Sequence, residues 1–181
     1  MISEGFLNPE AVVGNFGILP AMRIADFGCG AGHIAILVAQ AVGSEGKITA
    51  LDIMEDKLDS LRSQARSANL NNIETTRANL EVLGSSGLNN DSQDLVLLIN
   101  IMFQSNKKLE ILREALRVVK SGGKVILVEW KKSSGGKGQF GPPDSLRTSD
   151  GDMTNLFTQA GFKLDHPFSA GQFHYGLIFK K

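Results

Sequence analysis

Residues 23–32 read Arg23-Ile24-Ala25-Asp26-Phe27-Gly28-Cys29-Gly30-Ala31-Gly32, a short apolar run that breaks into three alternating glycines. Apolar side chains then recur at helical spacing, at Ile34, Leu37, Val38 and Ala41. The pattern predicts a strand, a glycine turn and a helix, which together bring backbone N–H groups close to a ligand. Glycine suits such a turn because it reaches positive φ at little cost and has no side chain that would block the ligand.

The rest of the chain alternates short apolar runs with helical patterns. We expect strands at 47–51, 73–77, 94–100 and 124–130, and helices from residue 55, over 106–120 and over 153–160. The consecutive apolar residues within 94–100 indicate a strand that is buried on both faces. Gly122 follows the 106–120 pattern, where a C-cap glycine would stand. The alternation predicts an α/β fold, with a doubly wound, mainly parallel sheet and helices on both faces.

Two further strands, 162–165 and 175–179, bring the expected sheet to seven strands. Only residues 166–174 connect them, which is too short for a crossover helix, so the last strand should be antiparallel. Ligands of doubly wound sheets bind at the carboxyl ends of the parallel strands. An antiparallel last strand begins at that edge, which places the connection, with His166 and His174, on the ligand side.

The first residues predict a short helix ahead of the core. Asn8-Pro9-Glu10 combines an N-cap residue, a proline suited to the first helical position and an acid in the first turn. With Phe6 and Phe16, this segment is either a packing flap or a lid over the glycine turn. We expect a single domain over 1–181, with the flap in 1–20 and the α/β core in 21–181.

Composition narrows the class of protein. At 181 residues the chain can bury a core without disulfides or a metal. Its 19 basic and 19 acidic residues balance, which gives no strong nucleic-acid signature. The start does not read as a signal peptide, and no apolar run approaches the ~20 residues of a membrane helix. The single cysteine, Cys29, cannot form an intramolecular disulfide, so we expect a cytoplasmic protein without a Cys/His metal site.

The glycine turn allows two chemical interpretations. Gly30-x-Gly32-x-x-Ala35 fits the dinucleotide fingerprint, with Asp52 about 20 residues on, where a ribose-binding acid belongs. The fuller string Asp26-x-Gly28-x-Gly30-x-Gly32 adds an acid at the end of the strand. This string resembles motif I of the class I, Rossmann-like S-adenosylmethionine-dependent methyltransferases. The acid after the second strand, the Gly-Gly pair within 116–124 and the closing antiparallel hairpin match that family in the same order.

The resemblance implies S-adenosylmethionine as the cofactor. Backbone groups of the glycine turn would approach its methionine part, Asp26 would attract its ammonium, and Asp52 would accept hydrogen bonds from both ribose hydroxyls. Asn79 stands where the family usually has an acid that meets the adenine amino group, and its amide oxygen could accept the same bond. The resemblance therefore implies these cofactor-binding residues: Asp26, Gly28, Cys29, Gly30, Gly32, Asp52, Ile53, Met54, Asn79, Leu80 and Asn100.

The resemblance implies methyl transfer but does not identify the acceptor. Glu129 and His174 are the candidate catalytic residues, as general bases at the ligand edge. The segment 100–103 lacks the prolines of the Asn/Asp-Pro-Pro-Tyr/Phe motif, which weakens adenine-type and glutamine-type amino acceptors. A lone cysteine argues against cysteine-assisted C5 methylation of pyrimidines and against arsenite methylation. A small or partly apolar acceptor is favoured by five apolar residues: Phe6, Phe16, Met102, Phe103 and Trp130.

Three alternatives stay open. The fingerprint with Asp52 would also suit an NAD-dependent oxidoreductase. A module that binds S-adenosylmethionine without transferring its methyl group is possible, because no catalytic residue is evident. A macromolecular acceptor could dock on the open edge of so bare a core. The sequence does not indicate the oligomeric state.

Overall fold

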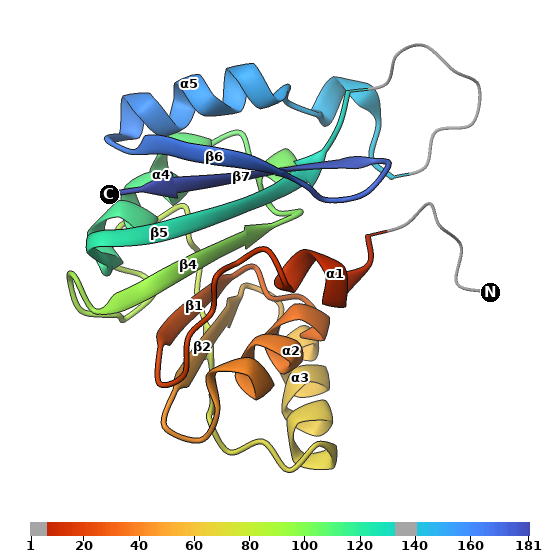
Figure 1. Cartoon of the computed structure of the whole chain (residues 1–181), viewed down its shortest axis with the longest axis vertical. Helices are drawn as coiled ribbons and strands as arrows, with labels where there is room; N and C mark the ends of the chain where they lie inside the picture. Colours follow the sequence, from red (N-terminus) through yellow and green to blue (C-terminus); the bar gives the residue numbers. More distant parts are fainter. Residues whose placement is uncertain (1–6, 133–140) are drawn as a thin grey trace.

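The computed structural model describes residues 7–132 and 141–181, so Phe6 and the loop at 133–138 lie outside the described residues. Seven strands form one sheet in the order β3-β2-β1-β4-β5-β7-β6 (Figure 1). Strands β1 to β5 pair in parallel and β7 runs antiparallel to both of its neighbours, which confirms the predicted doubly wound sheet. The strands are β1 Arg23–Phe27, β2 Lys47–Asp52, β3 Ile73–Arg77, β4 Gln93–Ile99, β5 Val119–Trp130, β6 Lys163–Ser169 and β7 His174–Lys180.

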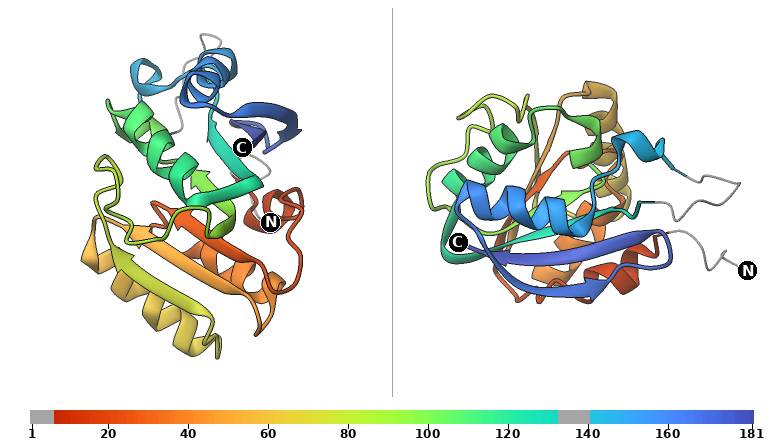
Figure 2. Two further views of the ribbon diagram at one scale, coloured as in Figure 1. Left: turned by 90° about the vertical axis from the view of Figure 1, so that its left-hand side faces the viewer. Right: turned by 90° about the horizontal axis from the view of Figure 1, so that it is seen from above.

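Helices cover both faces of the sheet, as Figures 1 and 2 show. One apolar core lies under α1, α2 and α3, and the other lies under α4 and α5. Successive strand side chains point to opposite faces, so Leu95 and Leu97 enter the first core while Val96 and Leu98 enter the second. The helices are α1 Pro9–Val13, α2 His33–Val42, α3 Glu55–Ser67, α4 Lys108–Val118 and α5 Asp150–Ala160, with short 3₁₀ turns at η1 Met102–Gln104 and η2 Asp144–Leu146.

The prediction that Gly122 ends a helix was wrong. Helix α4 ends at Val118, and β5 begins at the next residue by pairing with Gln93 of β4. The pairing then shifts, because residues 120–123 of β5 bulge out before Lys124 pairs with Leu95. Gly122, at φ 75°, lies inside this bulge, so its positive φ serves a strand irregularity and not a helix cap.

The two histidines of the closing hairpin differ in position. His174 begins β7 and pairs with Trp130, the last residue of β5, so it lies at the carboxyl edge as predicted. The placement of His166 was wrong, because β6 extends to Ser169 and His166 pairs with Ile178 in the middle of the hairpin. Its ring is exposed and contacts Asp165.

The N-terminal segment is partly core and partly pocket wall. Asn8 caps α1 by accepting a hydrogen bond from the Ala11 N–H. Phe16 is 1% exposed and packs edge-on against Phe168, with ring centroids 6.2 Å apart, so it is a core residue and not part of a lid. Within the described residues, no helix has the length and apolar character that crossing a membrane requires.

Candidate functional site

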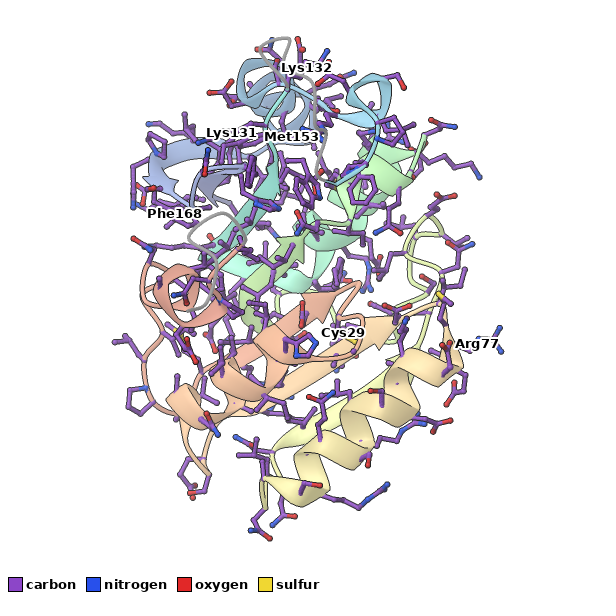
Figure 3. All side chains as sticks on the ribbon, turned by 90° about the vertical axis from the view of Figure 1, so that its right-hand side faces the viewer. Cys29, Arg77, Lys131, Lys132, Met153 and Phe168 are labelled. Carbon is purple, nitrogen blue, oxygen red and sulfur yellow. The ribbon has the colours of Figure 1, made fainter. Side chains whose placement is uncertain are left out.

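The glycine turn connects β1 to α2 at the carboxyl edge of the sheet, where Figure 3 labels Cys29. Gly28, Gly30 and Gly32 all have positive φ, at 74°, 52° and 91°. The N–H groups of Gly28 and Cys29 both donate to the Leu51 carbonyl, at 2.7 and 3.0 Å, which ties the turn to the end of β2. A Cβ on Gly28 would lie 2.6 Å from Ile101 Cδ1, so the turn also needs glycine for close packing.

Asp52 fastens the glycine turn to the start of α3. Its Oδ2 accepts from the Gly30 N–H at 2.9 Å, and its Oδ1 accepts from the N–H of Met54, the N-cap residue of α3, at 2.9 Å. Each carboxylate oxygen has a second lone pair. The carboxylate therefore holds the local backbone and can still accept two hydrogen bonds from a ligand.

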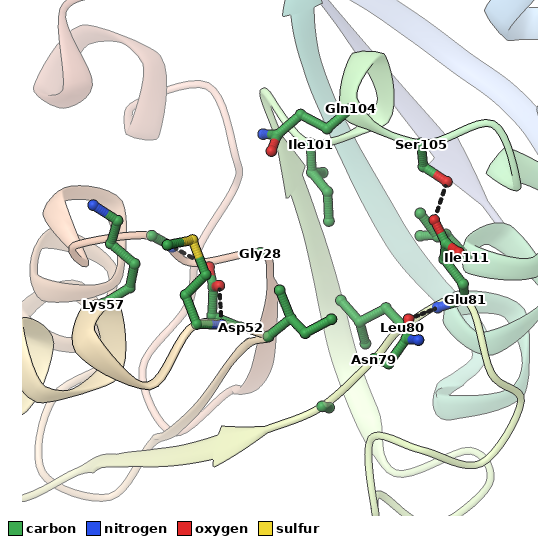
Figure 4. A pocket seen from close by; sticks show the side chains of 14 residues that line it. Gly28, Asp52, Lys57, Asn79, Leu80, Glu81, Ile101, Gln104, Ser105 and Ile111 are labelled. Atoms are coloured by element: carbon green, nitrogen blue, oxygen red, sulfur yellow. Dashed lines mark hydrogen bonds between the residues drawn. The ribbon is translucent and has the colours of Figure 1, made fainter.

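A cavity of about 340 Å³ opens on the Asp52 side of the turn (Figure 4). This volume suits a nucleoside-sized ligand. Its wall brings together many of the predicted residues, and it contains others that the sequence did not single out. The predicted residues are Gly28, Gly30, Asp52, Ile53, Met54, Asn79 and Leu80, and the additional ones are Lys57, Ala78, Glu81, Ile101, Gln104, Ser105 and Ile111.

A second cavity adjoins the first across the turn, since Gly28, Gly30 and Gln104 line both. It contains Asp26 and Asn100, each with a buried oxygen, Oδ2 and Oδ1, that has no hydrogen-bond partner among the described residues. Burial, with a contribution from the Asp52 charge, raises the pKa of Asp26 from 3.8 to about 7. Asn100 adopts φ 54°, a strained conformation for a residue with a side chain, of the kind that clusters at functional sites.

Cys29 and Gly32 belong to the turn in different ways. Cys29 lines the second cavity, and burial, together with the charges of Asp26 and Asp52, raises the pKa of its thiol, which makes it a poor nucleophile. Gly32 is the N-cap of α2 and lines neither cavity. A Cβ there would collide with Leu61 of α3, so Gly32 permits packing between helices.

Two glycines of the turn give a matched test of this packing. Gly32→Ala places a Cβ against Leu61 at φ 91° and is expected to lower the free energy of unfolding by about 1–3 kcal/mol. Gly30→Ala has no heavy atom within 4 Å of its new Cβ and φ 52°, so it should cost only about 1 kcal/mol. Urea unfolding of both variants checks the order, and an equal loss would contradict the packing role of Gly32.

Glu129 and His174 lie at the expected edge but on opposite faces of the sheet. Glu129 pairs with Tyr175 and Trp130 pairs with His174, and neighbouring pairs in a sheet face opposite ways. Tyr175 packs in the core under α4 and α5, so Glu129 is on that side. Neither residue lines either cavity.

Burial sets the protonation of both groups. Glu129 is 1% exposed, and desolvation raises its pKa from 4.5 to about 8 although its Oε2 accepts from the Phe103 N–H at 3.2 Å. His174 is 2% exposed, and desolvation, followed by the charges of Lys131 and Arg147, lowers its pKa from 6.5 to about 4. At neutral pH Glu129 is therefore mainly a protonated acid and His174 a neutral imidazole, whose ring is tilted by 43° to that of Trp130 with the ring centroids 4.0 Å apart.

Sequence reasoning missed residues that reach the site from loops. Ile101, Gln104 and Ser105 follow β4, and only the position just after a buried strand could have indicated them. Leu7 and His33 enter the second cavity from the segment before α1 and from the start of α2. No group of three or more His, Cys, Asp or Glu side chains within 7–132 and 141–181 is placed to hold a metal ion.

Comparison with known proteins places this geometry in a family. A family described as a methyltransferase domain matches residues 18–148, which is more than half of the chain. The chain is 29% identical over 113 residues to the demethylmenaquinone methyltransferase of Lactococcus lactis subsp. lactis, covering 62% of this chain and 44% of that protein. It is 27% identical over 108 residues to the arsenite methyltransferase of Homo sapiens, covering 56% and 29%. The chain thus spans less than half the length of these curated relatives.

Solved structures share the fold. A SAM-dependent methyltransferase from Aquifex aeolicus superposes with a TM-score of 0.85 at 23% identity, over 96% of this chain and 89% of that one. The [4+2]-cyclase SpnF superposes with a TM-score of 0.79 at 17% identity, over 95% and 80%. Likeness at these identities establishes the fold alone. With the family match over residues 18–148, however, the chain belongs to the class I methyltransferases, whose cofactor is S-adenosylmethionine.

Proposed function

We propose that this chain binds S-adenosylmethionine across the glycine turn and transfers its methyl group to a small or partly apolar acceptor. One observation carries the proposal: two cavities adjoin at Gly28 and Gly30, with the Asp52 carboxylate on one side and, on the other, buried oxygens that have no hydrogen-bond partner in 7–132 or 141–181. This division suits an elongated ligand that has a cation at one end and a nucleoside at the other.

The second cavity suits the methionine part. The unpartnered oxygens of Asp26 and Asn100 are acceptors that an ammonium group can satisfy, and burial strengthens such a contact. A Cβ on Gly30 would meet nothing within 4 Å, so the glycine leaves open space where the backbone borders both cavities. The start of α2, near His33, offers backbone N–H groups for a carboxylate.

The first cavity suits the nucleoside. Asp52 offers one remaining lone pair on each oxygen to the two ribose hydroxyls. Ile53 and Met54 are 55% and 49% exposed, which is unusual for large apolar side chains, and both line the cavity. A purine packed on them would remove this apolar surface from water.

The chemistry would depend on positioning. The sulfonium of bound S-adenosylmethionine supplies a methyl group that is already activated for displacement by a nucleophile. The chain would therefore bind and orient both reactants and exclude water. If the acceptor must lose a proton, neither candidate is a strong base at pH 7, because the lowered pKa of His174 makes its imidazole a weak base and Glu129 is mainly protonated there.

Only some of the apolar residues that favoured a small or partly apolar acceptor can contact one in the structure. Phe16 and Met102 are fully packed in the cores and cannot contact an acceptor, while Phe103 and Trp130 remain half-buried near the carboxyl edge. The relatives carry the names of demethylmenaquinone and arsenite methyltransferases, both of which denote small acceptors. The single, half-buried Cys29, with its raised thiol pKa, weighs against arsenite, which supports a partly apolar organic acceptor.

Two other functions fit less well. In an NAD-dependent oxidoreductase, a pyrophosphate at the glycine turn would lie near two carboxylates, Asp26 and Asp52. A module that binds S-adenosylmethionine without methyl transfer is consistent with the fold, since a [4+2]-cyclase has it too. The family match favours the methyltransferase.

Two measurements separate these functions. Calorimetry with S-adenosylhomocysteine and with NAD should show binding of the first ligand only, and binding of NAD alone would refute the proposal. Cofactor labelled on its methyl group, incubated with protein and cell extract, should label the small-molecule fraction. Label in the macromolecular fraction would contradict the small acceptor, and no label despite binding would favour the module.

Asp52→Ala tests the nucleoside side. We expect S-adenosylhomocysteine to bind at least about 10–100-fold more weakly, because that is the range for one hydrogen bond to a charged group and the variant loses two. Asp59→Ala, an exposed carboxylate of α3, serves as the control and should leave binding unchanged. Unaltered affinity in Asp52→Ala would refute the ribose assignment.

A further inference from the structure

The post-β4 segment, residues 100–105, forms a wall that the two cavities share. Gln104 lines both cavities, and Ile101 lines the first. Figure 4 shows both side chains along one side of the first cavity. Ile101 Cδ1 would lie only 2.6 Å from a Cβ on Gly28, so the segment packs closely on the glycine turn. The position of the post-β4 segment therefore sets the shape of the candidate site on both sides of the turn.

Glu129 of β5 holds the middle of the post-β4 segment. Its Oε2 accepts a hydrogen bond from the Phe103 N–H at 3.2 Å. In a 3₁₀ turn this N–H would bond the carbonyl three residues earlier, at Asn100. The Asn100 carbonyl instead accepts from Gln104 Nε2 at 2.9 Å. The Glu129 carboxyl thus supplies the partner of a backbone donor in the wall of the site.

The carboxyl that makes this bond is deeply buried. Glu129 is 1% exposed, and its Oε1 has no hydrogen-bond partner within 7–132 and 141–181. Desolvation raises its pKa to about 8, against smaller effects of the Phe103 N–H and of the Lys108 charge, and Tyr175 faces it from β7. At pH 7 the group is therefore mainly a protonated acid, whose carbonyl oxygen accepts from Phe103. An apolar side chain would avoid the cost of burying a polar group, but it could not accept this hydrogen bond.

We propose that Glu129 is a positioning residue, whose hydrogen bond to the Phe103 N–H holds the post-β4 segment against the glycine turn in the shape that the cofactor requires. The inference rests on the proposed binding of S-adenosylmethionine. Glu129 lines neither cavity, so it acts on the cofactor through Ile101 and Gln104 and takes no part in proton transfer. Without the bond, the free protein populates displaced positions of the segment, and the ligand binds more weakly because it must restore the original one.

Two substitutions of Glu129 test the proposal by calorimetry with S-adenosylhomocysteine at pH 7. Glu129→Leu removes the acceptor and should weaken binding about 5–100-fold, the range of one buried N–H left unpaired. Glu129→Gln keeps a carbonyl oxygen and a donor in the same places as the protonated acid, so its affinity should stay within about 2-fold of the wild type. The amide proton of Phe103 should exchange faster with solvent in Glu129→Leu and at the wild-type rate in Glu129→Gln.

Tyr175→Phe is the matched control at the same edge of the sheet. It removes the hydrogen bond from Tyr175 Oη to the Thr148 carbonyl at 3.0 Å, and it should leave the affinity unchanged even where it lowers stability. Wild-type affinity in Glu129→Leu would overturn the proposal, as would an equal loss in Glu129→Gln or in Tyr175→Phe. Should Glu129→Leu not fold, Glu129→Met replaces it and is judged by the same outcomes. A wild-type protein that does not bind S-adenosylhomocysteine would instead contradict the proposed cofactor.

Discussion

At pH 8 the Asp26→Asn variant is expected to be more stable than the wild-type protein and yet to bind S-adenosylhomocysteine more weakly. Asp26 is 2% exposed, and burial raises its pKa from 3.8 to about 7. An acid whose pKa is raised by folding favours the folded state at low pH, and this contribution is lost as the pH rises through about 7. Above that pH the folded protein must hold a buried, ionised carboxylate.

The size of the effect follows from the shift. About three pKa units correspond to roughly 4 kcal/mol, so Asp26→Asn should gain up to that amount at pH 8 and little at pH 4. Urea unfolding of both proteins from pH 4 to pH 8 measures the difference, in which the other titrating groups cancel. A variant less stable than the wild type at pH 8 would show that the folded protein stabilises the carboxylate.

Ligand binding should favour the wild-type protein over Asp26→Asn, which is the opposite of the expected order of stability. If the ammonium of the ligand pairs with ionised Asp26, as we propose, wild-type affinity for S-adenosylhomocysteine should fall as the pH drops below about 7. Asp26→Asn has no such proton to lose, and its weaker binding should stay constant between pH 6 and pH 8. The buried carboxylate of Asp26 would then lower the stability of the free protein and strengthen its binding of the cofactor.

Local sequence signals predicted most of the fold. The glycine turn, the buried run of β4 and the stripe of α4 each depend on spacing within one segment, and the structure has all three. The prediction for Gly122 was wrong because a glycine after a helix pattern resembles a C-cap. The bulge that contains Gly122 depends instead on the pairing of β5 with β4. Such pairing depends on a residue distant in sequence.

The candidate site shows the same division. Asp26 and Asp52 could be found because Asp26 is the last residue but one of β1 and Asp52 is the last residue of β2, both beside the glycine turn. That Glu129 and His174 occupy opposite faces depends on the register between β5 and β7, which no local pattern contains. The sequence also could not show that Asn79 Oδ1 accepts a hydrogen bond from the Glu81 N–H, since a residue type does not show which atom is already bonded.

Among the substitutions considered, replacement of Glu114 in α4 by alanine should cause the largest loss of stability. Its carboxylate is fully buried and accepts hydrogen bonds from Arg117, from the Gly84 N–H at 2.7 Å and from Ser86. Although burial alone would raise its pKa, these partners lower it to about 2. Glu114→Ala leaves buried donors unpaired, and we expect it to cost about 3–5 kcal/mol of unfolding free energy.

The pH dependence of the same network has the opposite sign from that of Asp26. A lowered pKa contributes stability that is complete above about pH 4.5 and is lost as the pH falls through about 2. The wild type should therefore lose stability in acid more steeply than Glu114→Ala does, when urea unfolding is followed from pH 5 to pH 2. Glu110→Ala, an exposed acid on the same helix, is the control and should change little.

Glu114→Ala should also affect ligand binding, because the Glu114 carboxylate holds the loop that contains Gly84 and Ser86. Gly84 and Ser86 lie in the loop whose beginning, at Asn79 and Glu81, lines the first cavity, to which we assign the nucleoside in our proposal. A loop released from α4 should weaken the binding of S-adenosylhomocysteine while the amide protons near Gly84 exchange faster with solvent. Wild-type affinity and exchange in Glu114→Ala would show that the loop is ordered without this carboxylate, and would separate the stability of α4 from the shape of the cofactor site.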